Sequence, residues 1–170
     1  MKKSIVSVLV IAVLAAVFGG CNYESPLVDD EAATPVADGL LGVWHAVSDE
    51  GAGKADPPVA LVQKFTDTAY LIQYPVQAKD SLYFRGYGVE IDGWTYLQIQ
   101  LIGTDKGPVK EADRKYDLVG YRIDGDNLAI RLLNTKVVPK TGGADVLLKA
   151  FRDNKDNPEL FGDVIRFKRP

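Results

Sequence analysis

Residues 81–102, SLYFRGYGVEIDGWTYLQIQLI, carry the clearest structural signal in this chain. Asp92 and Gly93 stand between two segments rich in apolar and aromatic residues, and this pair suits the positive backbone dihedrals of a two-residue hairpin turn. In the second segment apolar and polar side chains alternate, which is the period of a strand with one buried face. The stretch therefore predicts an antiparallel hairpin with strands at 81–91 and 94–102.

The rest of the chain repeats this pattern of short apolar segments separated by Gly, Asp, Asn and Pro. In full, the sequence predicts strands at 42–47, 59–65, 69–74, 81–91, 94–102, 116–123, 127–133 and 162–169. These eight strands favour an all-β, antiparallel meander that closes, or nearly closes, into a barrel, because closure leaves no exposed sheet edge. An open, strongly curved sheet is the alternative.

One segment departs from the β pattern. Ala144, Leu147, Leu148 and Phe151 follow the i, i+3, i+4, i+7 spacing of an amphipathic helix. Two glycines precede the segment and a proline follows it, as at helix boundaries. The sequence therefore predicts one short helix before the last strand.

The first 20 residues have the three parts of a secretory signal peptide. Lys2 and Lys3 give a cationic start, residues 5–18 form an apolar run that only Ser7 interrupts, and two small glycines follow. The apolar run is shorter than the roughly 20 residues that a membrane-spanning helix needs, which disfavours a permanent transmembrane anchor. We therefore expect residues 1–20 to be a signal peptide.

The end of this segment, Phe18-Gly19-Gly20-Cys21, resembles the lipobox of bacterial lipoproteins, in which Leu usually stands where this chain has Phe18. The resemblance implies that Cys21 is diacylglycerol-modified and becomes the mature N-terminus. Two or three acyl chains would hold the protein at a membrane almost permanently. Cys21 is the only cysteine, so an internal disulfide is excluded.

The residue after the lipobox cysteine bears on localisation. In lipoproteins of enteric-type bacteria, Asp at this position resembles a signal for retention in the inner membrane, and this chain has Asn22 instead. The resemblance therefore implies a lipid anchor in the outer membrane, with the periplasmic or surface face left open.

Residues 22–38, NYESPLVDDEAATPVAD, are acidic, contain two prolines and include no Lys or Arg. Such a composition favours an extended segment, because the carboxylates repel one another and few apolar side chains are available for burial. We expect residues 21–38 to join the lipid to a single domain at 39–170, as a chain of 170 residues allows. An acidic sorting signal that export machinery reads is the alternative.

Gly42-Val43-Trp44 resembles the Gly-x-Trp signature of lipocalins and their wider calycin relatives. The resemblance implies that Trp44 closes the base of the barrel and packs against a basic residue near the last strand, a place for Arg166 or Arg169. The Thr-Asp-Tyr motif of lipocalins is absent. The layout from Leu40 onward also resembles small bacterial lipoproteins that begin with Leu-x-Gly-x-Trp, and no activity follows from that resemblance.

Residues suited to catalysis are few. His45 is the only histidine, and Asp92, Asp124 and Asp126 stand where hairpin turns require such residues for local reasons. We therefore expect no enzyme activity, no catalytic residue, no metal site and no cofactor. The formal net charge of −3 disfavours nucleic acid as a partner.

The remaining candidate site is polar and aromatic. Tyr83, Arg85 and Tyr87 share one face of the first hairpin strand, and Tyr96, Gln98 and Gln100 share one face of the second. If the two faces coincide, these residues form a patch or line a lumen suited to ligand binding.

Three functions follow from these features. The first is a membrane-anchored lipoprotein of the cell envelope that binds a small apolar or amphipathic molecule without catalysis. The second is a protein-interaction, inhibitor or structural envelope lipoprotein with a packed barrel. The third, a hydrolase with acidic residues, requires two convergent carboxylates.

Overall fold

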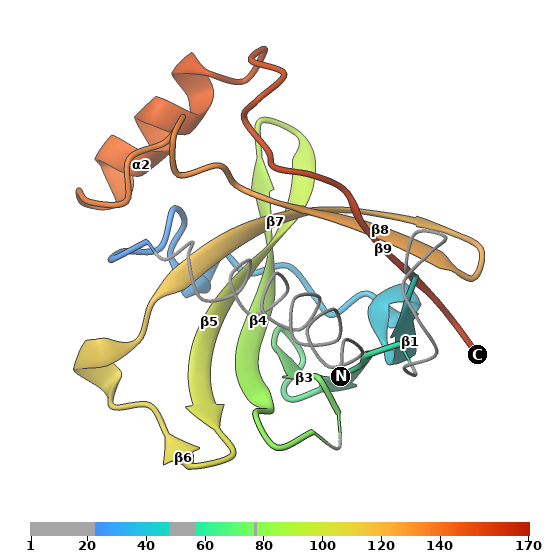
Figure 1. Ribbon diagram of the computed structural model, residues 1–170. Coiled ribbons are helices and arrows are strands. Elements are labelled where there is room, and N and C mark those ends of the chain that lie inside the picture. Colours follow the sequence, from blue (N-terminus) through green and yellow to red (C-terminus); the bar gives the residue numbers. More distant parts are fainter. Residues whose placement is uncertain (1–22, 48–56, 77) are drawn as a thin grey trace, which may run out of the picture.

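The computed structural model describes residues 23–47, 57–76 and 78–170 (Figure 1). Nine strands form one antiparallel sheet. They are β1 (Gly42–Ala46), β2 (Val59–Lys64), β3 (Tyr70–Tyr74), β4 (Leu82–Ile91), β5 (Trp94–Thr104), β6 (Gly107–Pro108), β7 (Tyr116–Asp124), β8 (Asn127–Leu132) and β9 (Ile165–Lys168). The helical elements are the 3₁₀ turns η1 (Asp30–Ala32), η2 (Asp38–Leu40) and η3 (Glu111–Asp113), and the helix α2 (Ala144–Asp153).

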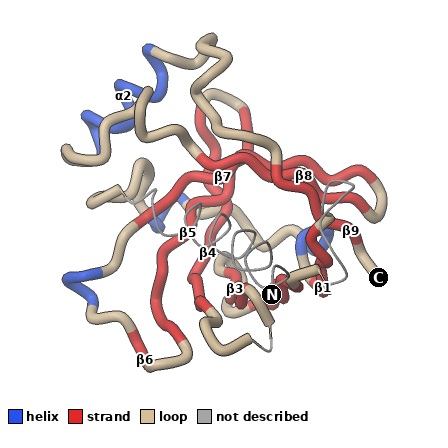
Figure 2. Tube along the Cα trace, viewed as in Figure 1, coloured by secondary structure: helices blue, strands red, loops and turns tan. Residues whose placement is uncertain are grey.

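Eight of the strands close into a barrel. The strands β1 to β5 pair in sequence order. β5 then pairs with β7, β7 with β8, and β8 with β9. The barrel closes where β9 pairs with β1, with Ala46 opposite Phe167. The short β6 pairs with the end of β5 and adds a ninth strand, which the sequence did not predict. The predicted all-β barrel with one short helix before the last strand is confirmed, and Figure 2 shows how strands make up its wall.

The hairpin between β4 and β5 turns where the sequence places it. Asp92 has φ of 52° and Gly93 has φ of 81°, as a two-residue turn with two positive dihedrals requires. Ile91 pairs with Trp94 across the turn, which fixes the register of both strands.

The barrel interior is apolar. Alternate side chains of the strands point inward and form a core with Leu40 of η2. The strand residues of this core are Trp44, Ala60, Val62, Tyr70, Tyr74, Phe84, Leu97, Ile99, Val119, Leu128, Leu132 and Phe167. Trp44 is fully buried, and its indole N–H donates a hydrogen bond to the carbonyl of Leu40 at 2.9 Å. The buried Trp44, whose indole N–H is hydrogen-bonded, therefore joins the turn η2 to the base of the barrel.

A second core lies on the outer face of β4, β5 and β7. The N-terminal segment, residues 23–36, and α2 contribute to it together with outward side chains of these strands. Its buried members are Tyr23, Leu27, Tyr87, Val89, Ile91, Leu118, Leu133, Val138, Leu147, Phe151 and Leu160. One sheet thus has a core on each side.

The N-terminal segment differs from the extended tether that the composition predicts. Tyr23 is 0% and Leu27 is 1% exposed, and the Tyr23 N–H donates to the Tyr116 carbonyl at 2.8 Å. Further along, the Thr34 N–H donates to the Gly88 carbonyl at 2.8 Å on β4. A few apolar side chains and backbone hydrogen bonds to the sheet are sufficient to fix this acidic segment, because the outer face of the sheet offers matching apolar surface.

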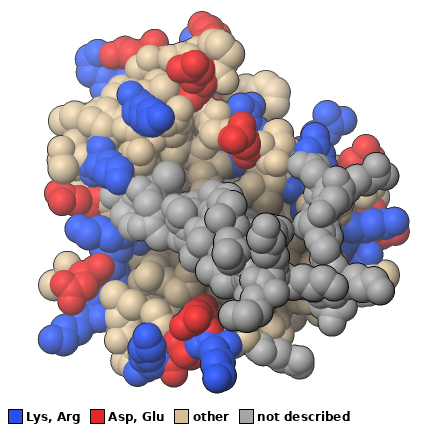
Figure 3. Space-filling view, in the orientation of Figure 1, with Lys and Arg blue, Asp and Glu red and all other residues tan. Residues whose placement is uncertain are grey.

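No helix among the described residues is long and apolar enough to cross a membrane. Among the described residues on the face drawn in Figure 3, basic and acidic side chains are interspersed.

Candidate functional site

The register of β4 and β5 brings the predicted polar and aromatic residues onto one face. Arg85 pairs with Gln100, and Tyr87 pairs with Gln98. Their neighbours Phe84, Leu97 and Ile99 belong to the barrel interior, so the polar and aromatic face is the outer one. The two predicted faces therefore coincide outside the barrel and do not line its lumen.

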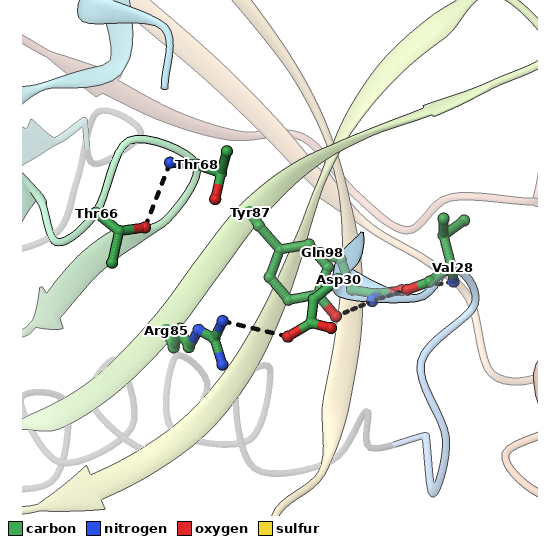
Figure 4. Close-up of polar contacts among 7 residues, drawn as sticks. All are labelled: Val28, Asp30, Thr66, Thr68, Arg85, Tyr87 and Gln98. Carbon is green, nitrogen blue, oxygen red and sulfur yellow. Dashed lines mark hydrogen bonds and ion pairs between the residues drawn. The ribbon is translucent and has the colours of Figure 1, made fainter. Parts of the chain in front are cut away.

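Gln98 holds the N-terminal segment on this face (Figure 4). Its Oε1 accepts hydrogen bonds from the N–H groups of Leu27 at 2.7 Å and Val28 at 3.2 Å. Its Nε2 donates to the Val28 carbonyl at 2.8 Å and to the Tyr87 hydroxyl at 2.5 Å. Gln98 is fully buried, and these bonds satisfy both ends of its amide.

The two other predicted tyrosines also contact the protein itself. Tyr96 stacks on Phe161, with ring centroids 5.9 Å apart, and meets Phe151 of α2 edge to face. The Tyr83 hydroxyl accepts a hydrogen bond from Gln73 Nε2 at 3.2 Å. Tyr96 is thus a packing residue of the outer core, and a ligand-binding role for these side chains stays a prediction.

Arg85 is the charged residue of this face. Its Nη2 lies 3.2 Å from Asp30 Oδ2 in the N-terminal segment, and its guanidinium lies 5.9 Å from the centre of the Tyr87 ring (Figure 4). The Arg85 Nε is buried and makes no hydrogen bond within the described part of the chain. Burial raises the pKa of Tyr87 to about 12.

A polar hollow of about 210 Å³ opens beside Arg85. Its lining residues come from the N-terminal segment, from β4 and β5, and from the start of β7, and they are Pro26, Asp29, Asp30, Arg85, Tyr87, Gln100 and Tyr116. Sequence reasoning found Arg85, Tyr87 and Gln100 through strand alternation. It missed Pro26, Asp29, Asp30 and Tyr116, because no local pattern shows where an irregular segment docks.

The barrel interior contains a smaller cavity of about 70 Å³. Apolar and aromatic side chains line it, including Trp44, Phe84 and Phe167. A cavity that admits benzene measures about 150 Å³ in other proteins. The space inside this barrel is therefore less than half of that volume.

Of the two arginines that the sequence offered as the partner of Trp44, Arg169 packs on its ring and Arg166 does not. The Arg169 guanidinium lies 4.5 Å from the centre of the Trp44 ring, and its Nη2 donates to the Gly39 carbonyl at 2.9 Å. Arg166 is exposed in β9, one residue before the inward Phe167. The alternation of β9 turns Arg166 outward, whereas Arg169 follows the strand and is free to fold back over the ring.

The acidic candidates do not converge. Asp92 Oδ1 pairs with Arg152 Nε at 3.1 Å, and Asp124 and Asp126 are exposed at the hairpin between β7 and β8. No group of three or more potential metal ligands occurs within residues 23–47, 57–76 and 78–170. Cys21, the predicted lipidation site, lies outside the described residues.

One buried carboxyl group was not predicted. Asp117, at the start of β7, is 4% exposed, and its Oδ1 makes no hydrogen bond among the described residues. Burial raises the pKa of Asp117 to about 8, although the positive charge of Lys140 acts in the opposite direction. Apolar residues alternate along β7, but this pattern indicates that Asp117 is buried only once the register of β7 with its neighbouring strands is known.

The chain matches no protein-family model, no curated protein and no solved structure.

Proposed function

We propose that this chain is a lipid-anchored, non-catalytic lipoprotein of the bacterial cell envelope that binds its partner at the outer surface of the barrel. The observation that carries this proposal is the packed interior. Its cavity of about 70 Å³ is far below the roughly 300–1,000 Å³ of sites for drug-sized molecules. Binding at the outer face does not require the core to open.

The docked N-terminal segment supports the membrane part of the proposal. Tyr23 is fixed to β7, and only one residue separates it from Cys21. Two residues of extended chain span at most about 7 Å. Acyl chains on Cys21 would therefore hold the barrel directly at the lipid headgroups, and the start of β7 would be among its nearest parts.

Lipid labelling tests the anchor. The full-length chain is produced in a bacterial host that is fed an alkyne analogue of palmitate. We expect the wild-type chain to take up the label and to sediment with membranes, and we expect Cys21→Ser to lose both properties. Asn22→Ser, which keeps the cysteine, is the matched control. An unlabelled wild-type chain in the soluble fraction would refute the anchor.

Native mass spectrometry of the same lipidated protein tests where it binds. We expect the mass of the chain with its acyl groups and no additional apolar molecule. Retention of such a molecule, together with its loss when Val62→Trp fills the cavity, would show that the lumen is the binding site instead.

A small apolar molecule in the lumen is the second candidate. The observation in its favour is that the cavity is lined by apolar and aromatic side chains alone. A molecule larger than a few heavy atoms requires these side chains to move, because packed cores contain little free space. The variant Phe84→Ala enlarges the cavity, and on this second reading it would increase the uptake of benzene from solution.

A further inference from the structure

The polar hollow exists because two distant parts of the chain meet. Residues 26–30 form one wall, and side chains of β4, β5 and β7 form the other. Together the walls present two carboxylates, one guanidinium, one amide and two phenol rings. A polar hollow built by docking of an ordered segment is a preformed site for a small polar molecule.

Gln100 lines this hollow with a side-chain amide that has no hydrogen-bond partner among the described residues, and the buried Arg85 Nε beside it also makes no hydrogen bond there. Gln100 is 8% exposed and lies on the outer face of β5 opposite Arg85. Its side-chain amide takes part in no hydrogen bond within the described ranges, in contrast to that of Gln98. An amide offers two N–H donors and one carbonyl acceptor, so a group that both donates and accepts would satisfy it.

The charges beside Gln100 are largely neutralised. Arg85 and Asp30 form an ion pair with 3.2 Å between Nη2 and Oδ2, which leaves Asp29 as the one uncompensated charge of the lining. The Asp29 carboxylate would repel an anion in the hollow, and the only cation of the lining, Arg85, is already paired with Asp30. The lining therefore favours an uncharged molecule whose hydroxyl groups donate to Asp29 and bond to Gln100.

The phenol rings complete the wall. Tyr87 and Tyr116 both line the hollow. The Arg85 guanidinium lies over the Tyr87 ring, which is only 4% exposed, so the partly exposed Tyr116 offers the ring surface. A flat aromatic side chain with a polar tip suits a molecule that has one apolar C–H face and a polar edge. Sugar rings have both features.

We propose that this hollow binds one neutral sugar ring, either as a free sugar or as the end of an envelope glycan. The volume of about 210 Å³ limits the occupant to a single ring. The inference rests on the proposed function, because that function places binding at the outer surface of the barrel.

The test uses the full-length lipidated protein in a detergent without a sugar headgroup. Saturation-transfer NMR is recorded with glucose, galactose and N-acetylglucosamine, and the affinity of the best ligand is measured by titration. We expect transfer to at least one sugar, and we expect Gln100→Met to weaken its binding about tenfold. Gln63→Met, an exposed glutamine on the outer face of β2, is the matched control and should bind as the wild type does.

A second variant keeps the test independent of folding. Asp29 is exposed, so Asp29→Asn should leave the melting temperature unchanged and still weaken sugar binding severalfold. Soluble cell-wall glycan fragments distinguish the sources. Tighter binding of these fragments than of free sugars indicates a glycan end, and equal binding indicates a free sugar.

Two results would overturn the inference. One is the absence of transfer to every sugar and glycan at tens of millimolar, and the other is equal sugar binding by wild type, Gln100→Met and Asp29→Asn. Binding of serine in place of sugars would assign the hollow to a zwitterion and would also overturn it. Since palmitate labelling of Cys21 is measured separately, a failure here leaves the anchor proposal intact.

Discussion

Asp117 is a carboxyl group that the fold keeps away from water at the start of β7. Its pKa in the folded protein, about 8, exceeds the ordinary value of 3.8, mainly because burial disfavours the charged form. Between these two pH values the folded chain retains a proton that the unfolded chain has released. The contribution of Asp117 to stability is therefore greatest below pH 3.8 and falls as pH rises to about 8.

Asp117→Asn should remove this pH dependence. Urea unfolding at about pH 5 and about pH 8 gives the free energy of unfolding of the wild type and of the variant. The effect of the other carboxyl groups is the same in both proteins and cancels when the two values are subtracted. We expect the wild type to lose up to about 1.4 kcal/mol per pH unit relative to Asp117→Asn. Parallel stability curves for the two proteins would show that Asp117 titrates normally in the folded state.

Gln98→Leu should release the N-terminal segment. The variant leaves the backbone groups of Leu27 and Val28 without their partner, at about 1–3 kcal/mol for each buried group. We expect a loss of at least about 2 kcal/mol in the free energy of unfolding. Hydrogen exchange at Leu27 should also become faster, whereas Gln63→Leu on the exposed face of β2 should change neither quantity. Unchanged exchange at Leu27 would mean that Gln98 does not hold the segment.

At the scale of single residues, sequence alternation correctly placed Tyr87 and Gln98 on one face. It could not reveal what Gln98 contacts, because its partners are mostly backbone atoms of Leu27 and Val28, and backbone atoms are the same in every sequence. The sequence also could not decide whether Arg166 or Arg169 packs on Trp44. Arg169 lies beyond the end of β9, where alternation no longer dictates direction.

At the scale of elements, strong patterns predicted the structure and weak ones did not. The strand β5 and the helix α2 have clear periods and turn residues at their ends, and both form as expected. The strand β6 has two residues, Gly107 and Pro108, which is too short for any alternation. The N-terminal segment has the composition of a disordered region, yet it is fixed by a partner surface that is distant in sequence.

Gly88 allows this segment to reach β4. A Cβ atom at Gly88 would lie 2.2 Å from Thr34 Oγ1, which is far inside contact distance. Gly88→Ala should therefore destabilise the protein by about 1–3 kcal/mol in urea unfolding. The double variant with Thr34→Ala should recover most of this loss, because it removes the clashing oxygen.

The control for this pair is Gly143→Ala. A Cβ atom at Gly143 meets nothing within 4 Å, and its φ of −71° suits alanine. Gly143 is the N-cap residue of α2, where alanine is less favourable than glycine, so this variant should lower stability by no more than about 1 kcal/mol, and Thr34→Ala should not recover that loss. If Thr34→Ala fails to rescue Gly88→Ala, the contact between segment and strand is not the cause of the loss.

At the scale of the whole molecule, one sheet separates an inner core from an outer one. Leu147 of α2 is fully buried in the outer core, while its neighbour Val146 is 55% exposed. Leu147→Ala should lower the free energy of unfolding by about 2–5 kcal/mol, and Val146→Ala should lower it by less than about 0.5 kcal/mol. Because both cores share β4, β5 and β7, fluorescence and far-UV circular dichroism should report one coincident transition. Two separate transitions would show that the outer core unfolds alone.

The seam between β1 and β9 makes folding of this barrel a late and non-local event. The strands that close it are the first and the last of the meander, so their ends must be brought together across most of the chain. Such high contact order slows folding to milliseconds or longer. Until β9 docks, β1 and β8 both expose strand edges on which a neighbouring copy can pair, so domain exchange and aggregation compete with closure.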